Sequence, residues 1–131
     1  MTTTAAPSPE LIFGTIQSYQ RSFALKAGVD LDLFTAIGEG AATVPVIAGR
    51  IAASERGVRI LCDFLTISGL LTKSGDRYQL TPDAAAFLDK RSPAYMGSMT
   101  EFLLAPDIMR NFADLAATVK RGTVAPQARS P

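Results

Sequence analysis

The side chains that most often carry out enzyme chemistry are scarce in this sequence. Its 131 residues include no His and a single Cys, Cys62. These counts exclude a Ser-His-Asp triad, a Cys-His pair, a His-based zinc site and an internal disulfide. Cys62 lies beside Asp63 in an apolar helical pattern with no evident cation nearby, which predicts a buried, reduced and inert thiol.

Neither the carboxylates nor the glycines form a catalytic or cofactor motif. Asp30 and Asp32 are two positions apart, so on a helix they point to different sides and do not readily share a metal ion or a proton. Gly38-Glu39-Gly40 superficially resembles a phosphate-binding loop, but it follows a helical pattern rather than a strand, so we interpret it as a turn. We therefore expect no catalytic, metal-binding or cofactor-binding residue in this chain.

The composition predicts one globular domain with a substantial core. Hydrophobic residues make up 47% of the chain, and 13 Lys and Arg against 12 Asp and Glu give a net charge of +1. Such a balance provides no general attraction to nucleic acid or to an anionic membrane. No apolar run reaches the roughly 18 to 20 residues that span a bilayer, and Met1 to Glu10 lacks the features of a signal peptide. We expect a cytoplasmic protein.

Helix-start signals and apolar spacing predict two helices before residue 40. Ser8-Pro9-Glu10 is a typical helix start, and apolar residues at spacings of three and four follow it as far as Ala27. Gly28 is expected to end or bend this helix. A second helical pattern from Val29 ends at Gly38 to Gly40.

The middle of the chain predicts a winged helix-turn-helix. Helices over 44–53 and 54–68 are joined almost without a loop, and Gly69 ends the second. Two short strands, 70–73 and 77–80, lie on either side of the Ser74-Gly75-Asp76 turn and form the wing.

Three further helices are expected after the wing: one from Thr81-Pro82-Asp83 through Leu88, one over 94–104 started by Ser92-Pro93, and one from Pro106 to Gly122. The predicted fold is mainly α, a winged helix-turn-helix with extra N- and C-terminal dimerisation helices and a small two-stranded β wing. We expect a disordered tail at 1–8, one domain over 9–122, and a tail over 123–131.

The sequence carries more apolar helix surface than a winged-helix core can absorb. The first helix and the two after Arg91 each have a stripe of large side chains, and three such stripes left in water would favour aggregation. Burial against a second copy is the economical solution, although packing within one chain as a helical bundle is the alternative. The expected homodimer interface consists of Ile12, Ile16, Tyr19, Phe23, Phe102, Leu103, Ile108, Phe112, Leu115 and Val119.

Four segments in this order resemble the N-terminal dimerisation domain of S-adenosylmethionine-dependent O-methyltransferases: 24–34, 43–53, 61–71 and 78–81. The most specific parts are the aliphatic run into Leu33-Phe34, the turn Gly69-Leu70-Leu71 and the end of the wing at 78–81. The resemblance covers 9 to about 122. Asp32 stands where the family usually has Gly, and Pro45-Val46 replaces a common acidic pair; both departures concern helix caps.

The resemblance implies that the chemistry takes place in a second domain, which binds S-adenosylmethionine and supplies a catalytic His. This chain alone is then inactive, either as a fragment whose linker starts in 123–131 or as a free-standing relative without a catalytic half. The dimerisation helices of the family also shape the pocket for a small aromatic or polyketide-like substrate. The candidates for this role, which are otherwise interface core, are Phe13, Tyr19, Tyr95, Met96, Met99, Phe102 and Met109.

Two other classes of function remain open. A winged helix is common in DNA-binding regulators; Arg56 and Arg59 lie on the would-be recognition helix, and Lys73 and Arg77 lie on the wing. However, residues 54–91 contain six basic and five acidic residues, whereas a DNA reader concentrates positive charge there. The third class is a regulator that binds a small ligand or a protein in a groove between the terminal helices, although no polar groups are placed to orient a specific ligand.

Overall fold

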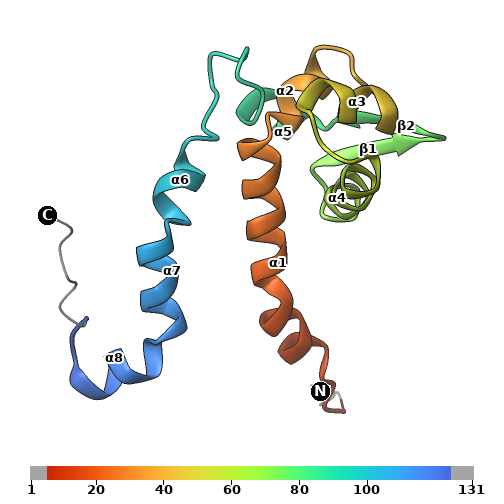
Figure 1. The fold of residues 1–131 in the computed structure, drawn as a ribbon. Helices are drawn as coiled ribbons and strands as arrows, with labels where there is room; N and C mark the ends of the chain where they lie inside the picture. Colours follow the sequence, from red (N-terminus) through yellow and green to blue (C-terminus); the bar gives the residue numbers. More distant parts are fainter. Residues whose placement is uncertain (1–5, 125–131) are drawn as a thin grey trace, which may run out of the picture. The chain divides into compact units, whose positions relative to one another are not determined.

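The computed structural model describes residues 6–124, which belong to two compact units, Met1–Gly97 and Ser98–Pro131 (Figure 1). The first unit contains α1 (Glu10–Asp30), α2 (Leu33–Gly38), α3 (Val44–Ile51), α4 (Glu55–Ile67), β1 (Leu71–Ser74), β2 (Arg77–Leu80) and α5 (Pro82–Phe87). The second contains α6 (Met99–Leu103), α7 (Pro106–Ala113) and α8 (Leu115–Arg121). This order confirms the mainly helical fold with one two-stranded antiparallel sheet.

The first unit holds the predicted helix-turn-helix and wing. The Ser54 hydroxyl caps α4 by accepting a hydrogen bond from the Gly57 amide at 2.9 Å, so the turn between α3 and α4 needs no longer loop. In the wing, Leu71 pairs with Leu80 and Ser74 with Arg77. The Tyr78 amide also donates to the Ala42 carbonyl at 2.8 Å, which ties the wing to the segment before α3.

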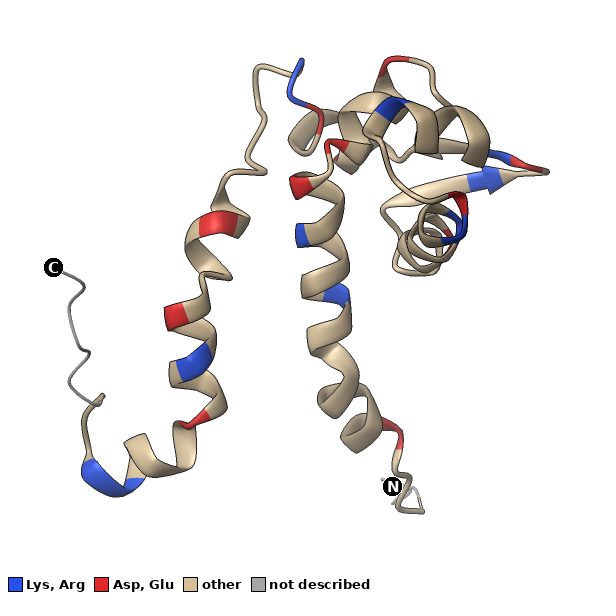
Figure 2. Cartoon of the chain, viewed as in Figure 1, with Lys and Arg blue, Asp and Glu red and all other residues tan. Residues whose placement is uncertain are grey.

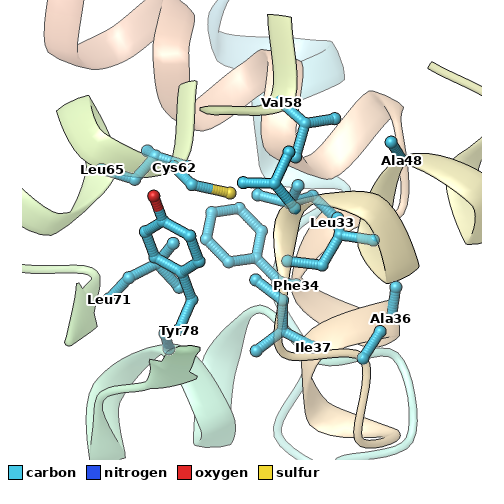
Figure 3. Close-up of a cluster of buried hydrophobic side chains, with 14 of the residues drawn as sticks. Leu33, Phe34, Ala36, Ile37, Ala48, Val58, Cys62, Leu65, Leu71 and Tyr78 are labelled. Carbon is cyan, nitrogen blue, oxygen red and sulfur yellow. The ribbon is translucent and has the colours of Figure 1, made fainter. Parts of the chain in front are cut away.

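The core lies where α2, α3, α4 and the hairpin meet (Figure 3). Its largest side chains with almost no exposure are Tyr78, Phe34, Leu33, Ile47, Leu65, Leu71, Val58 and Cys62. They come from five elements, so the core depends on the tertiary arrangement of the whole unit. Cys62 is confirmed as a buried free thiol, and burial raises its pKa to about 11.

The helix boundaries around the first turn differ from prediction. Gly28 does not end α1, which continues to Asp30. Instead Gly28 lets the Phe34 ring approach, because a Cβ at position 28 would lie 2.5 Å from Phe34 Cε2. The chain turns at Asp32, which has a left-handed φ of 58° that glycine adopts most readily and Asp tolerates. Helix α3 ends at Ile51 instead of residue 53, since Ala52 also has a positive φ.

The helix predicted over 94–104 is wrong for its first half. The Ser92 hydroxyl donates to the Ala86 carbonyl at 2.6 Å and accepts from the Ala94 amide at 3.3 Å. The Met96 amide then donates to the Phe87 carbonyl at 2.8 Å. These bonds hold the segment as turns against the end of α5, and only 99–103 is helical. Tyr95 and Met96 therefore do not lie on a helix face.

The single helix predicted from Pro106 to Gly122 is divided at Asp114. This residue has φ −106° and ψ 26°, outside the helical range, and separates α7 from α8. The predicted end is confirmed, because Gly122 takes a left-handed φ of 81° and its amide donates to the Thr118 carbonyl at 2.8 Å.

Candidate dimerisation surface

The N-terminal half of α1 carries the largest exposed apolar stripe of the first unit. Every residue from Glu10 to Arg21 is exposed. Ile12, Ile16 and Tyr19 keep 61%, 62% and 58% of their surface accessible, and Phe23 keeps 42%. Because α-helical residues advance about 100° each, these four side chains fall within a sector of roughly 60°. They form what we call the α1 stripe, which lacks cover in the described part of the chain.

The rest of the unit packs against other sides of α1. Ala24 and Leu25 contact the core, and Gly28 and Val29 are buried. On the polar side of the helix, Gly14, Gln17, Ser18, Gln20 and Arg21 line an open groove of about 400 Å³ together with Phe64, Ile67 and Ser68 of α4. The α1 stripe is thus left outside the fold while α1 itself is anchored to it.

The second unit exposes a comparable set of apolar side chains. Phe102, Phe112 and Val119 keep 72%, 64% and 71% of their surface accessible. Leu103 and Leu115 are also exposed, whereas Ile108 is half-buried. Nine of the ten predicted interface residues are therefore exposed in a single chain. That exposure is what an interface requires before its partner is bound.

The residues predicted to shape a substrate pocket are spread over three segments. Phe13 and Tyr19 lie on α1, Tyr95 and Met96 in the turns after α5, and Met99, Phe102 and Met109 in the second unit. Tyr95 and Met109 are half-buried and the other five are exposed. None of them lines the groove between α1 and α4. Their assembly around one substrate stays a prediction.

The wing and α4 share a cluster that neutralises charge. Asp63 accepts hydrogen bonds from the Tyr78 hydroxyl at 2.5 Å and from Lys73 Nζ at 3.0 Å. These bonds hold the pKa of Asp63 below its ordinary value, and Lys73 lies 5.1 Å from the centroid of the Tyr78 ring. Of the two wing cations, Lys73 is therefore already bound to a carboxylate of the would-be recognition helix, whereas Arg77 is exposed and makes no ion pair within residues 6–124.

The outer face of α4 is apolar, which the sequence pattern did not lead us to predict. Ile60 and Ile67 keep 60% and 83% of their surface accessible, and half-buried Phe64 lies between them. Their spacing of four and three is the same signal that identifies the α1 stripe. Phe64 also fits the core pattern of the helix, so the second stripe is easily overlooked.

The chain leaves α5 through a polar clamp that was also not predicted. The carboxylate of Asp89, a residue only 4% exposed, accepts from Arg91 Nη2 at 2.8 Å, and the same Nη2 donates to the Gly38 carbonyl at 2.5 Å. The Lys90 amide donates to the Thr35 hydroxyl at 3.1 Å. Segment 89–91 is thereby fixed to α2, and the bonds from Arg91 hold the pKa of Asp89 below its ordinary value. Groups 53 and 55 residues apart in sequence give no local signal of this clamp.

Metal-binding and membrane-spanning features are both missing from residues 6–124. They contain no cluster of three or more His, Cys, Asp or Glu side chains arranged to hold a metal ion. They also include no helix with the length and apolar character needed to cross a bilayer.

Comparison with known proteins gives a consistent relationship. The family model described as the O-methyltransferase dimerisation domain matches residues 13–90. The tetracenomycin polyketide synthesis 8-O-methyl transferase TcmO of Streptomyces glaucescens is 34% identical over 90 residues, which are 68% of this chain and 26% of that protein. The N,N-dimethyltransferase OxyT of Streptomyces rimosus is 32% identical over 80 residues, 61% of this chain and 23% of that protein.

Solved structures extend the match to the second unit. A candidate O-methyltransferase from Nostoc punctiforme PCC 73102 is 48% identical, with a TM-score of 0.85 over 90% of this chain and 36% of its own. Human N-acetylserotonin methyltransferase in complex with SAM shares the fold, with a TM-score of 0.78 at 24% identity, over 93% of this chain and 37% of its own. This chain therefore spans between 23% and 37% of the length of these four proteins.

Proposed function

The chain belongs to the O-methyltransferase dimerisation-domain family, and we propose that its function is to pair two copies of a methyltransferase. The observation that carries this proposal is the α1 stripe, four large side chains exposed on a helix whose C-terminal half packs against the core. Burial of a large apolar side chain contributes roughly 1.5 to 3 kcal/mol. In a homodimer, each copy covers surface that the other leaves in water.

The proposed interface combines the α1 stripe with the apolar residues of the second unit, Phe102, Leu103, Ile108, Phe112, Leu115 and Val119. At about half exposure, a large side chain offers roughly 100 Å². The nine exposed residues then supply about 900 Å² per copy, against the roughly 800 Å² per partner of a standard interface. The α1 stripe alone supplies about half of that requirement, so both units are needed.

Substitution of the stripe tests the pairing. Ile12→Glu and Ile16→Glu place carboxylates where the interface is apolar, and the dimer Kd measured by sedimentation velocity should rise by at least about 100-fold, since two apolar contacts are lost and two charges are desolvated. Val46→Glu is the matched control. Val46 is 52% exposed on α3, outside the proposed interface, and its replacement should leave the Kd unchanged. A wild-type chain that stays monomeric at about 100 µM, or stripe variants that dimerise normally, would refute the proposal.

Catalysis and S-adenosylmethionine binding are assigned to another part of the parent protein. Within residues 6–124 the sheet is a two-stranded antiparallel hairpin whose turn contains Gly75, and no glycine-rich loop links a parallel strand to a helix. The described residues therefore do not form a binding site for S-adenosylmethionine, and we assign them no part in the methyl-transfer reaction. In support of a SAM-dependent parent, the human relative is in complex with SAM. We assign the domain to 9–122, and 123–131 to a tail or the start of a linker.

A contribution to the acceptor pocket is proposed for Phe13, Tyr19, Tyr95, Met96, Met99, Phe102 and Met109. Aromatic and thioether side chains suit a flat aromatic or polyketide-like acceptor. In a polypeptide that joins this domain to a SAM-binding domain, Met99→Ala and Phe102→Ala should raise the KM for the acceptor and leave the affinity for S-adenosylmethionine unchanged. Unchanged acceptor KM and specificity in both variants would limit these residues to the interface.

A further inference from the structure

A second apolar surface lies on a different helix from the α1 stripe. We call it the α4 face: Ile60, Phe64 and Ile67, whose positions fall on the side of α4 opposite the buried Val58, Cys62 and Leu65. Ile67 has the largest exposed fraction of all the large apolar residues described, 83%. The face continues into the groove of about 400 Å³ that α4 forms with the polar side of α1. Phe64 and Ile67 supply the apolar side of this groove and α1 supplies its polar side, so an amphipathic helix could contact both.

The charge around the α4 face is positive and unpaired. Arg21 is the one charged residue lining the groove. Arg56 lies one turn before Ile60 on the same side of α4. Neither arginine makes an ion pair within residues 6–124, whereas the acid nearest on this face, Asp63, is bound to Lys73 and Tyr78. An occupant with an apolar helix face and carboxylates would match this surface.

Such a segment exists in the second unit of the same sequence. From Ser98 to Asp114 the chain carries three acids, Glu101, Asp107 and Asp114, and one base, Arg110, for a net charge of −2 (Figure 2). Arg110 pairs with Asp107, which leaves Glu101 and Asp114 without an ion pair in the described part of the chain. The segment also exposes Met99, Phe102 and Phe112. If two α6–α7 segments met each other across a twofold axis, like charges would be opposed.

We propose that the α4 face and its groove receive the α6–α7 segment of a second copy of this chain. The inference rests on the proposed homodimer and specifies which surfaces meet in it. Each copy then contributes one groove and one acidic segment, so the contact occurs twice and closes on itself. The helix that reads DNA in other winged-helix proteins serves here as a receptor for the partner subunit.

Charge reversal tests the contact directly. One variant carries Arg21→Glu and Arg56→Glu, and the other carries Glu101→Lys and Asp114→Lys; all four side chains are exposed. In a homodimer of either variant, the groove and the segment carry charges of the same sign at both contacts. The dimer Kd of each variant should therefore rise about tenfold at low salt. In a heterodimer of the two variants, each groove faces a segment of opposite charge. This heterodimer should form with a Kd near that of the wild-type dimer. Sedimentation with one variant fluorescently labelled measures both, and circular dichroism checks that each variant is folded.

A chain that combines all four substitutions distinguishes the alternatives. It should recover the wild-type dimer, as the mixture does. Recovery in the combined chain without recovery in the mixture would mean that α6–α7 contacts the groove of its own chain, which overturns the inference. Unchanged dimerisation in both variants would also overturn it, while the Ile12 and Ile16 variants would still test the proposed function separately. An uncharged substitution, Ile67→Ser, should weaken the wild-type dimer; if it does not, the α4 face is not part of the contact.

Discussion

Replacement of Gly28 by Ala has two opposite effects on the free energy of unfolding, and the structure indicates which of them is larger. In an exposed helix interior, Gly→Ala stabilises a protein by up to about 1 kcal/mol. At position 28 the added Cβ would lie 2.5 Å and 2.9 Å from Phe34 Cε2 and Cζ. Ordinary carbon contacts lie near roughly 3.5 to 4.0 Å, so the ring must move by about 1 Å.

The Phe34 ring has little room for that movement. The residue is completely inaccessible and packs among the largest side chains of the core. Overpacking of a close-packed interior costs about 1 to 3 kcal/mol. After the helix gain is subtracted, Gly28→Ala should lower the free energy of unfolding by up to about 2 kcal/mol.

Urea denaturation at one fixed protein concentration measures this difference, because the stability of a dimer depends on concentration. Gly49→Ala is the matched control. Gly49 lies exposed within α3, and a Cβ there would have no neighbour within 4 Å. The control should gain about 0.5 to 1 kcal/mol. A Gly28→Ala protein as stable as the control would refute the packing of Phe34 against α1.

Three further predictions concern titration, reactivity and DNA. The lowered pKa of Asp89 provides stability that is present above the unfolded value, about 3.9, and is lost as the pH falls through the native value. Asp89→Asn should therefore lose less of its unfolding free energy between about pH 6 and pH 2 than wild type, and an equal loss would exclude the clamp. Cys62, with a pKa of about 11 and no exposure, should react with a thiol reagent at about pH 8 only as fast as the protein opens, so rapid labelling of the native state would contradict its burial. Finally, a gel shift at low salt should show no tight, salt-sensitive binding of duplex DNA, whereas such binding would revive the regulator hypothesis.

Local signals were sufficient for the winged helix but not for the segment after α5. Ser54 and Thr81 both cap their helices as predicted, and Gly69 takes the left-handed conformation expected after α4. Ser92-Pro93 has the same appearance in sequence, but the Ser92 hydroxyl bonds to Ala86 and not to the first turn of a helix. The Met96 amide also donates to the Phe87 carbonyl, so a cap residue indicates a helix only when no earlier element binds the backbone that follows it.

Candidate surfaces show the same division between local and tertiary information. The α1 stripe was predictable because a single period of three and four runs through a helix whose first half is exposed on all sides. The α4 face was missed because α4 has two apolar sides, and sequence does not reveal which side the core uses. Only the burial of Val58, Cys62 and Leu65 leaves Ile60 and Ile67 outside.

The fold and the surface of this domain can therefore be considered separately. The buried residues of α2, α3, α4 and the wing account for the winged-helix architecture. The residues exposed on the outside can vary without a change of fold. On that outer surface, Asp63 binds the wing lysine and isoleucines occupy the exposed side of α4, so two features that would favour DNA are replaced. The ion pair neutralises Lys73 and the isoleucines add apolar area, while the unpaired Arg21 and Arg56 suit a protein segment that carries carboxylates. Pairing of subunits depends on the surface residues, while the fold supplies a rigid base that holds α1 and α4 in place.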